Sequence, residues 1–183
     1  YYKLKGVVEE ILESERISDV KFVPEKNNPS YHPGRCAKVY AGDRYIGVFG
    51  QIHPLVAANY GVDTELYAGE LEFDAIFQAR GPHPQYKPLP KYPSISRDIA
   101  VVCNKEITVA ELEKTIRLGG GSILKGVELF DIYTGSHIAQ GKKSVAFSLT
   151  LRDDSKTLTV EEADKEVKNI LDRLENDLGA VIR

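Results

Sequence analysis

The chain has 183 residues, of which 42% are hydrophobic and 28% charged, with a formal net charge of −3 and a pI near 5.9. This composition is ordinary for a globular protein and leaves room for one domain or two modest ones. The mild acidity argues against a non-specific nucleic-acid binder, whose surface is usually strongly basic, but permits a small specific RNA contact. No apolar run reaches the roughly 20 residues that cross a bilayer, so no membrane partner is expected.

The first residues of the chain and its two cysteines indicate the cellular compartment in which the protein is expected. The sequence begins with Tyr1-Tyr2 rather than methionine and enters a helical pattern at once, so we expect a piece of a longer protein without a signal peptide. Cys36 and Cys103 lie within apolar strand patterns, which fits a reducing cytosol better than a disulfide scaffold. We therefore expect a cytoplasmic location.

The first part of the chain is expected to mix helices with an antiparallel sheet. Helical spacing predicts a helix over residues 3–12, and a short strand follows over residues 20–23. A hairpin is expected next, with strands over residues 36–40 and 45–52. A short helix over residues 54–60 and a strand over residues 66–73 follow, and Asp74 caps a brief turn after that strand. The prolines after His32 and His53 indicate that these histidines orient turns, and no histidine spacing suggests a metal site.

Residues 80–93 separate two domains. They contain Pro82, Pro84, Pro88, Pro90 and Pro93, a density that neither a helix nor a central strand accommodates. We expect an extended, semi-rigid connector here, with one domain over residues 1–79 and another over residues 94–183.

The second part of the chain predicts a βαββαβ order. Strands are expected over residues 98–103, 127–133, 142–152 and 180–182. Capping boxes begin two helices, one at Thr108–Glu111 that ends at the glycines 119–121, the other at Thr159–Glu162 that ends at Gly179. This is the ferredoxin-like arrangement, in which right-handed crossovers place both helices on one side of the sheet. The fold class is therefore α+β.

Strand alternation predicts which side chains line the helix-free face. In the strand 142–152, Val145, Phe147, Leu149 and Leu151 form an apolar core face. In the strand before it, Phe130 and Ile132 are expected to share the core face, and Leu129, Asp131 and Tyr133 the other. Asp131, Tyr133, Ser144 and Ser148 then lie on an open, polar face suited to a flat polar ligand.

Both parts of the chain resemble one family. The motifs Y-P-S-I-S-R-D-I-A-V-V, E-L-F-D-I-Y-T-G with G-K-K-S-V-A-F-S-L, and T-L-T-V-E-E are similar to the ferredoxin-like, anticodon-binding domain that ends the β subunit of bacterial phenylalanyl-tRNA synthetases. Upstream, L-K-G-V-V-E-E-I-L and H-P-G-R-C-A-K-V-Y-A-G-D-R-Y-I-G-V-F-G-Q-I-H-P resemble the same subunit's catalytically silent, class II synthetase-like antiparallel module. The resemblance covers essentially the whole chain.

The resemblance implies a role in ligating phenylalanine to tRNA-Phe. The family's enzyme is a cytoplasmic α2β2 assembly that uses ATP and Mg²⁺, with its active site on the α subunit. A chain corresponding only to the last part of β is expected to hold no catalytic residue, metal or cofactor of its own. Its expected partners are tRNA-Phe and the α subunit.

The family's contacts to the first anticodon base, a guanine, fall on Asp131, Tyr133 and Ser144. The resemblance gives Tyr133 the stacking role and Asp131 and Ser144 the hydrogen-bonding roles, as in RNA readers that splay single-stranded bases onto aromatic rings. Lys142 and Lys143 either contact phosphate or only solvate the strand edge. Arg97 either contacts phosphate or forms a structural ion pair.

Two other functions remain to be weighed. A ferredoxin-like small-molecule regulatory domain would have a polar pocket at its strand–helix loops and no role for Asp131 or Tyr133. A general RNA-recognition motif needs several aromatic residues on its sheet, where this sequence offers Ser144, Ala146 and Ser148 instead. The sequence favours neither.

Overall fold

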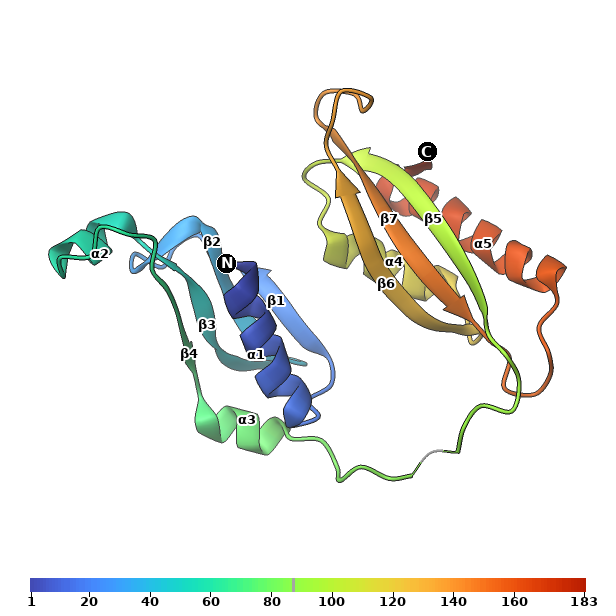
Figure 1. The fold of residues 1–183 in the computed structure, drawn as a ribbon, viewed down its shortest axis with the longest axis horizontal. Helices are drawn as coiled ribbons and strands as arrows, with labels where there is room; N and C mark the ends of the chain where they lie inside the picture. The colour runs from blue at the N-terminus through green and yellow to red at the C-terminus, as the bar shows by residue number, and fades with distance from the viewer. Residues whose placement is uncertain (87) are drawn as a thin grey trace. The chain divides into compact units, whose positions relative to one another are not determined.

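The computed structural model describes residues 1–86 and 88–183, which form two compact units (Figure 1). Unit 1 comprises Tyr1–Tyr86 and unit 2 the described residues that follow it. The division falls inside the predicted connector, of which residue 87 lies outside the described residues. In the described part of residues 80–93 there is neither helix nor strand.

Unit 1 is an antiparallel sheet with helices. In chain order its elements are α1 (Tyr2–Ser14), β1 (Val20–Pro24), β2 (Tyr31–Ala41), β3 (Arg44–Ile52), α2 (Pro54–Asn59), β4 (Tyr67–Leu71) and α3 (Phe73–Ala79). The sheet order is β1-β2-β3-β4, with every neighbouring pair antiparallel. One core cluster joins α1 and α3 to the sheet through Val8, Leu12, Val39, Ile46, Phe49 and Ala75, among others. The predicted helices and strands of this unit are present in the expected order, and α3 is an additional helix.

Local chemistry explains where unit 1 departs from the expected boundaries. Residues 73–79 form a helix rather than a brief turn, since Ala75 packs into the core and Asp74 lies in the first helical turn, where an acidic side chain is favourable. His53 begins α2 by accepting a hydrogen bond at Nδ1 from the Leu55 N–H (3.2 Å). His32 accepts one from the Gly34 N–H (3.1 Å) within β2, where the pairing with β3 is irregular, so His53 orients a turn as predicted and His32 lies in a strand instead.

The first residues of the predicted connector belong to unit 1 and pack against the end of α1. The Gly81 N–H donates to the Glu15 carbonyl (3.0 Å), and Arg16 Nε donates to the Pro82 carbonyl (2.8 Å). A Cβ at Gly81 would lie 2.2 Å from the Arg16 carbonyl oxygen, so this approach requires glycine. The backbone hydrogen bonds of the chain after α3 are therefore partly satisfied by the end of α1.

Unit 2 has the predicted βαββαβ order. Its elements are β5 (Ile95–Asn104), α4 (Val109–Gly119), β6 (Leu124–Tyr133), β7 (Lys142–Leu151), α5 (Val160–Leu178) and β8 (Val181–Ile182). The antiparallel sheet has the order β6-β7-β5-β8, and Figure 1 shows α4 and α5 together behind it. The core between helices and sheet contains Ile99, Val101, Cys103, Leu112, Ile116, Val145, Phe147, Leu149, Ile170 and Leu174.

The helix boundaries of unit 2 follow from its capping residues. Both predicted capping boxes are present, with Thr108 and Glu111 at the start of α4 and Thr159 and Glu162 at the start of α5. Helix α5 ends at Gly179, whose φ of 60° is in the left-handed region that favours glycine. The described residues contain no helix that is both long and apolar enough to span a membrane.

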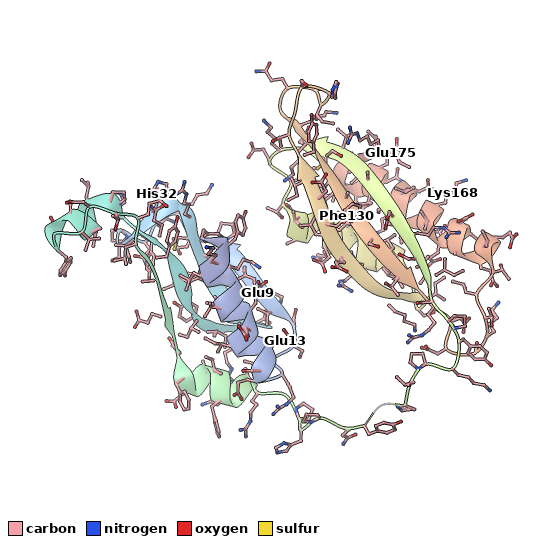
Figure 2. The ribbon with its side chains drawn as sticks, viewed as in Figure 1. Glu9, Glu13, His32, Phe130, Lys168 and Glu175 are labelled. Carbon is pink, nitrogen blue, oxygen red and sulfur yellow. The ribbon has the colours of Figure 1, made fainter. Side chains whose placement is uncertain are left out.

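A bulge in β6 corrects the predicted faces of that strand. Leu129 pairs with Phe147 and Asp131 with Ala146, so Phe130 is an extra residue without its own partner on β7. Leu129 therefore shares the core face with Phe147, not the open face with Asp131 and Tyr133. Phe130, labelled in Figure 2, does not join the core and is 56% exposed. Simple alternation cannot reveal this because an inserted residue reverses the parity of the strand before it.

Candidate functional site

The helix-free face of unit 2, called here the open face, consists of four rows of paired residues. Because directly paired residues point to the same side of a sheet, the register defines each row. From one end to the other the rows across β6, β7 and β5 are Gly126–Thr150–Ser96, Glu128–Ser148–Asp98, Asp131–Ala146–Ala100 and Tyr133–Ser144–Val102. The predicted placement of Asp131, Tyr133, Ser144 and Ser148 on this face is confirmed.

Tyr133 and Ser144 form the last of these rows. Tyr133 lies at the end of β6 and is half-buried. Ser144 is paired with Tyr133 on one side and with Val102 on the other, and only 4% of it is exposed. Its hydroxyl group is therefore less accessible than an open-face position suggests, because a small side chain lies between two larger ones.

Arg183 lies over the tyrosine ring. Its N–H donates to the Ala100 carbonyl (2.9 Å), which extends the pairing of β8 with β5 by one residue. Its guanidinium carbon is 5.6 Å from the centroid of the Tyr133 ring, within the range of a cation–π interaction. No sequence motif points to Arg183, although alternation from Val181, which pairs with Val102, places Arg183 on the open face.

Asp131 and the two lysines occupy different positions around this row. Asp131 is exposed one row from Tyr133, and within the described part of the chain it forms no ion pair. Lys142 is the first residue of β7 and pairs with Asn104. It lies two residues before Ser144, so it is on the open face as well. Lys143 pairs with the buried core residue Cys103 and so points to the helix side.

Arg97 is not part of the open face. It pairs with the core residue Leu149, and its Nε donates to Asp164 of α5 at 3.0 Å. Of the two roles left open by the sequence, the structure supports the ion pair between sheet and helix. Arg97 and Lys143 are therefore separated from the group formed by Asp131, Tyr133, Ser144, Lys142 and Arg183.

The other end of the open face is acidic and rich in hydroxyl groups. Asp98 and Glu128 flank Ser148 in one row, and both carboxylates are exposed. The hydroxyl oxygens of Ser96 and Ser148 are 3.2 Å apart. Because phosphate groups are repelled by carboxylates, a polyanion is expected to lie at the end with Lys142 and Arg183.

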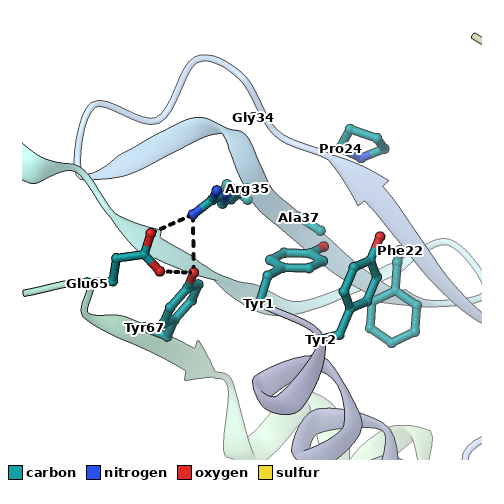
Figure 3. A pocket seen from close by; sticks show the side chains of 10 residues that line it. Tyr1, Tyr2, Phe22, Pro24, Gly34, Arg35, Ala37, Glu65 and Tyr67 are labelled. Carbon is teal, nitrogen blue, oxygen red and sulfur yellow. Dashed lines mark hydrogen bonds and ion pairs between the residues drawn. The ribbon is translucent and has the colours of Figure 1, made fainter.

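Unit 1 contains a pocket of about 600 Å³ at the start of α1 (Figure 3). Tyr1, Tyr2 and Phe22 line one side of it, and Arg35, Glu65 and Tyr67 form a hydrogen-bonded group on the other. Arg35 Nη1 is 2.9 Å from Glu65 Oε1, and the Tyr67 hydroxyl donates to Oε2 at 2.8 Å.

Within this group, the Glu65 carboxylate balances the positive charge of Arg35. The hydrogen bonds from Tyr67 and then Arg35 lower the pKa of Glu65, so the carboxylate remains ionised beside the guanidinium. A phosphate group would have to compete with Glu65 for Arg35. The described residues also contain no group of three or more His, Cys, Asp or Glu side chains placed to hold a metal ion.

Neither cysteine is placed for chemistry. Cys36 and Cys103 are free and buried, and burial raises the pKa of both thiols. A buried, protonated thiol is a poor nucleophile.

Two hollows of unit 2 lie along α5. A groove of about 360 Å³ runs between α5 and β8 and is lined by residues such as Asp164, Lys168, Asp172 and Glu175. Figure 2 labels Lys168 and Glu175 on this helix. A metabolite pocket at the strand–helix loops, which the regulatory-domain alternative requires, is a different arrangement.

Comparison with known proteins places both units in one context. Residues 90–183 match the family model described as ferredoxin-fold anticodon binding domain, and residues 1–73 match the phenylalanyl tRNA synthetase beta chain CLM domain. Phenylalanine–tRNA ligase β subunits are similar over the whole chain: 41% identity over 183 residues in Clostridium tetani, 38% over 184 in Lactiplantibacillus plantarum and 39% over 184 in Bacillus subtilis. The chain spans 23% of the length of each of these relatives.

Proposed function

The chain belongs to the family of ferredoxin-fold anticodon-binding domains, and we propose that the open face of unit 2 reads the anticodon of tRNA-Phe. The observation that carries this proposal is the group at one end of that face, where an aromatic ring, a free carboxylate and a guanidinium lie together. Proteins read single-stranded RNA by stacking splayed bases on aromatic side chains and hydrogen-bonding their edges. The group around Tyr133 supplies both kinds of contact.

Each residue of the group has a separate role. Tyr133 stacks the first anticodon base, a guanine, and Asp131 accepts hydrogen bonds from its N–H donors. Ser144, paired with Tyr133 across β6 and β7, completes the hydrogen bonding. Lys142 and Arg183 contact the RNA backbone. Arg97 and Lys143 have no place in this interface because both lie on the helix side of the sheet.

The proposed context is an α2β2 phenylalanine–tRNA ligase in the cytoplasm. Residues 1–79 form the end of a catalytically silent, class II synthetase-like module that serves assembly with the α subunit, residues 80–93 connect it, and residues 94–183 read the anticodon. Aminoacylation with ATP and Mg²⁺ takes place on the α subunit. The residues of unit 1 do not fit a nucleotide–metal complex, since Glu65 compensates Arg35 and the described carboxylates form no metal-binding group.

Substitution of Tyr133 tests the proposal. Tyr133→Ala should weaken binding of a tRNA-Phe anticodon stem-loop at low salt by about 5- to 150-fold, the range expected for loss of one base–aromatic stack. Tyr133→Phe retains the ring and should bind nearly as well as the unaltered chain. Equal affinity of the alanine variant and the unaltered chain, measured by fluorescence anisotropy with labelled stem-loop, would refute the stacking role.

A further inference from the structure

The connection between β6 and β7 passes very close to the Tyr133 ring. Gly135 lies two residues after Tyr133, and its carbonyl accepts a hydrogen bond from the Ile138 N–H at 3.0 Å, which closes a turn. A Cβ at Gly135 would lie 1.9 Å from Tyr133 Oη, 2.1 Å from Cζ and 2.7 Å from Cε1. Ordinary van der Waals contacts begin at about 3.4 Å, so no side chain fits while the ring keeps its place.

The need for glycine here concerns space and not backbone conformation. Gly135 is not among the glycines with positive φ, so its φ has the sign that residues with a Cβ normally adopt. All three of the nearest atoms belong to the hydroxyl end and edge of one aromatic ring. The obstacle to a larger residue is therefore the Tyr133 side chain alone.

Two further contacts limit where the ring can go. Tyr133 is paired with Ser144 through the strand register, which fixes its backbone, and the Arg183 guanidinium lies over the ring. A ring displaced at its hydroxyl end would change its position relative to the Arg183 guanidinium. Stacking depends on the orientation of the ring plane, so such a displacement should remove the surface on which a base packs.

We propose that Gly135 is a positioning residue for anticodon reading, which holds the Tyr133 ring in the orientation that stacks a base by leaving space for its hydroxyl end. This inference rests on the proposed function of the open face. It gives Gly135 a role that neither the turn after β6 nor the strand itself requires.

Gly141 offers a matched control within the same connection. Its φ is 82°, in the left-handed region, and a Cβ there would meet nothing within 4 Å. Gly141→Ala therefore strains the backbone of the connection without touching the ring. An effect that comes from a distorted connection should appear in both variants, whereas an effect on the ring should appear only in Gly135→Ala.

The experiment compares four variants of the 183-residue chain: Gly135→Ala, Gly141→Ala, Tyr133→Ala and the double variant Tyr133→Ala/Gly135→Ala. The aromatic NMR signals of Tyr133, assigned with Tyr133→Phe, report the ring. Affinity for the tRNA-Phe anticodon stem-loop reports binding. Gly135→Ala should shift the ring signals and lose most of the affinity that Tyr133→Ala loses, whereas Gly141→Ala should change neither. In the double variant, Gly135→Ala should add no further loss, since residues that act through one contact are not additive.

The outcomes separate this inference from the function on which it rests. Unchanged ring signals or unchanged affinity in Gly135→Ala, with weakened binding in Tyr133→Ala, would overturn the positioning role and leave the stacking role intact. Unchanged affinity in Tyr133→Ala would overturn both. If Gly135→Ala unfolds unit 2, recovery of the fold in the double variant would support the predicted conflict with the ring, and its absence would contradict it.

Discussion

The strand register explains why Tyr133, Ser144 and Arg183 lie together. In each strand, the alternation of side chains places the residue on the open face of the sheet. For Tyr133 and Ser144 this was predictable, since the apolar positions of β7 identify its core face and Ser144 has the opposite parity. Arg183 follows the same rule from Val181, but a basic residue after a two-residue strand carries no motif that draws attention to it.

Arg97 and Lys143 show the limit of reasoning from residue type. Arg97 has the parity of Ile95 and Ile99, and Lys143 that of Val145, which places both on the helix side. Residue type alone left phosphate contact open beside an ion pair for Arg97 and a solvated strand edge for Lys143. Long basic side chains can lie along a core face and extend their charge to its edge, as Arg97 does to reach Asp164.

Arg183 should make a backbone contact that is independent of base identity. We expect Arg183→Gln to weaken binding of anticodon stem-loops with different first bases by similar factors. The slope of log affinity against log salt should fall by about 0.7, the value for one phosphate contact to a single strand. Titrations at several salt concentrations measure both effects. Arg183→Lys keeps the charge and should keep the slope, and an unchanged slope in Arg183→Gln would exclude the phosphate contact.

At the scale of elements, helix starts were predictable and strand detail was not. The capping boxes at Thr108 and Thr159 combine two reciprocal hydrogen bonds within four residues, so a local sequence specifies them completely. The bulge at Phe130 depends on pairing with β7, which is a long-range property. The same holds for the 73–79 helix, since its formation depends on packing of Ala75 against the core of unit 1.

The start of α5 should make stability depend on pH. Lys156 and the Thr159 N–H both donate to Glu162, and these contacts, Lys156 first, lower the pKa of its carboxyl group. A pKa depressed by folding contributes stability above the usual pKa of a glutamate, and this stability is lost as the pH falls through the folded value. Thermal unfolding should therefore show Glu162→Gln less stable than the unaltered chain at neutral pH, with the difference vanishing in acid.

Thr159→Ala is the control for this dependence. The threonine hydroxyl accepts a hydrogen bond from the Glu162 N–H (3.3 Å), a contact that does not titrate. Its loss should cost about 1 kcal/mol of the free energy of unfolding at both neutral and acidic pH. A difference between Glu162→Gln and the unaltered chain that persists in acid would contradict the proposed role of the carboxylate charge.

At the scale of the molecule, each unit has its own core around one fully buried phenylalanine, Phe49 in unit 1 and Phe147 in unit 2. The proline-rich stretch predicted a connector because no packed element accommodates that density of prolines, and the division between the two units falls within it. The attachment of Gly81 and Pro82 to the end of α1 was not predictable, since those hydrogen bonds join residues far apart in the sequence.

These separate cores predict separate effects of matched substitutions. Phe147→Leu should destabilise unit 2 by about 1 kcal/mol or more and lower RNA affinity near its unfolding temperature. Phe49→Leu should destabilise unit 1 by a similar amount without changing the affinity. Hydrogen exchange measured for each unit distinguishes the two results, and loss of RNA binding in Phe49→Leu at a temperature where unit 2 is folded would show that unit 1 takes part in the interface.

The most direct measurement is the preference of the chain for the first anticodon base. Binding of the tRNA-Phe anticodon stem-loop at low salt is compared with a copy in which that guanine is replaced by adenine. The unaltered chain should prefer guanine, and Asp131→Asn should lose about ten- to hundredfold in this preference, the value of hydrogen bonds to a charged acceptor. Binding of both stem-loops with equal affinity by the unaltered chain, or a preference that survives in Asp131→Asn, would contradict reading of the anticodon by the open face.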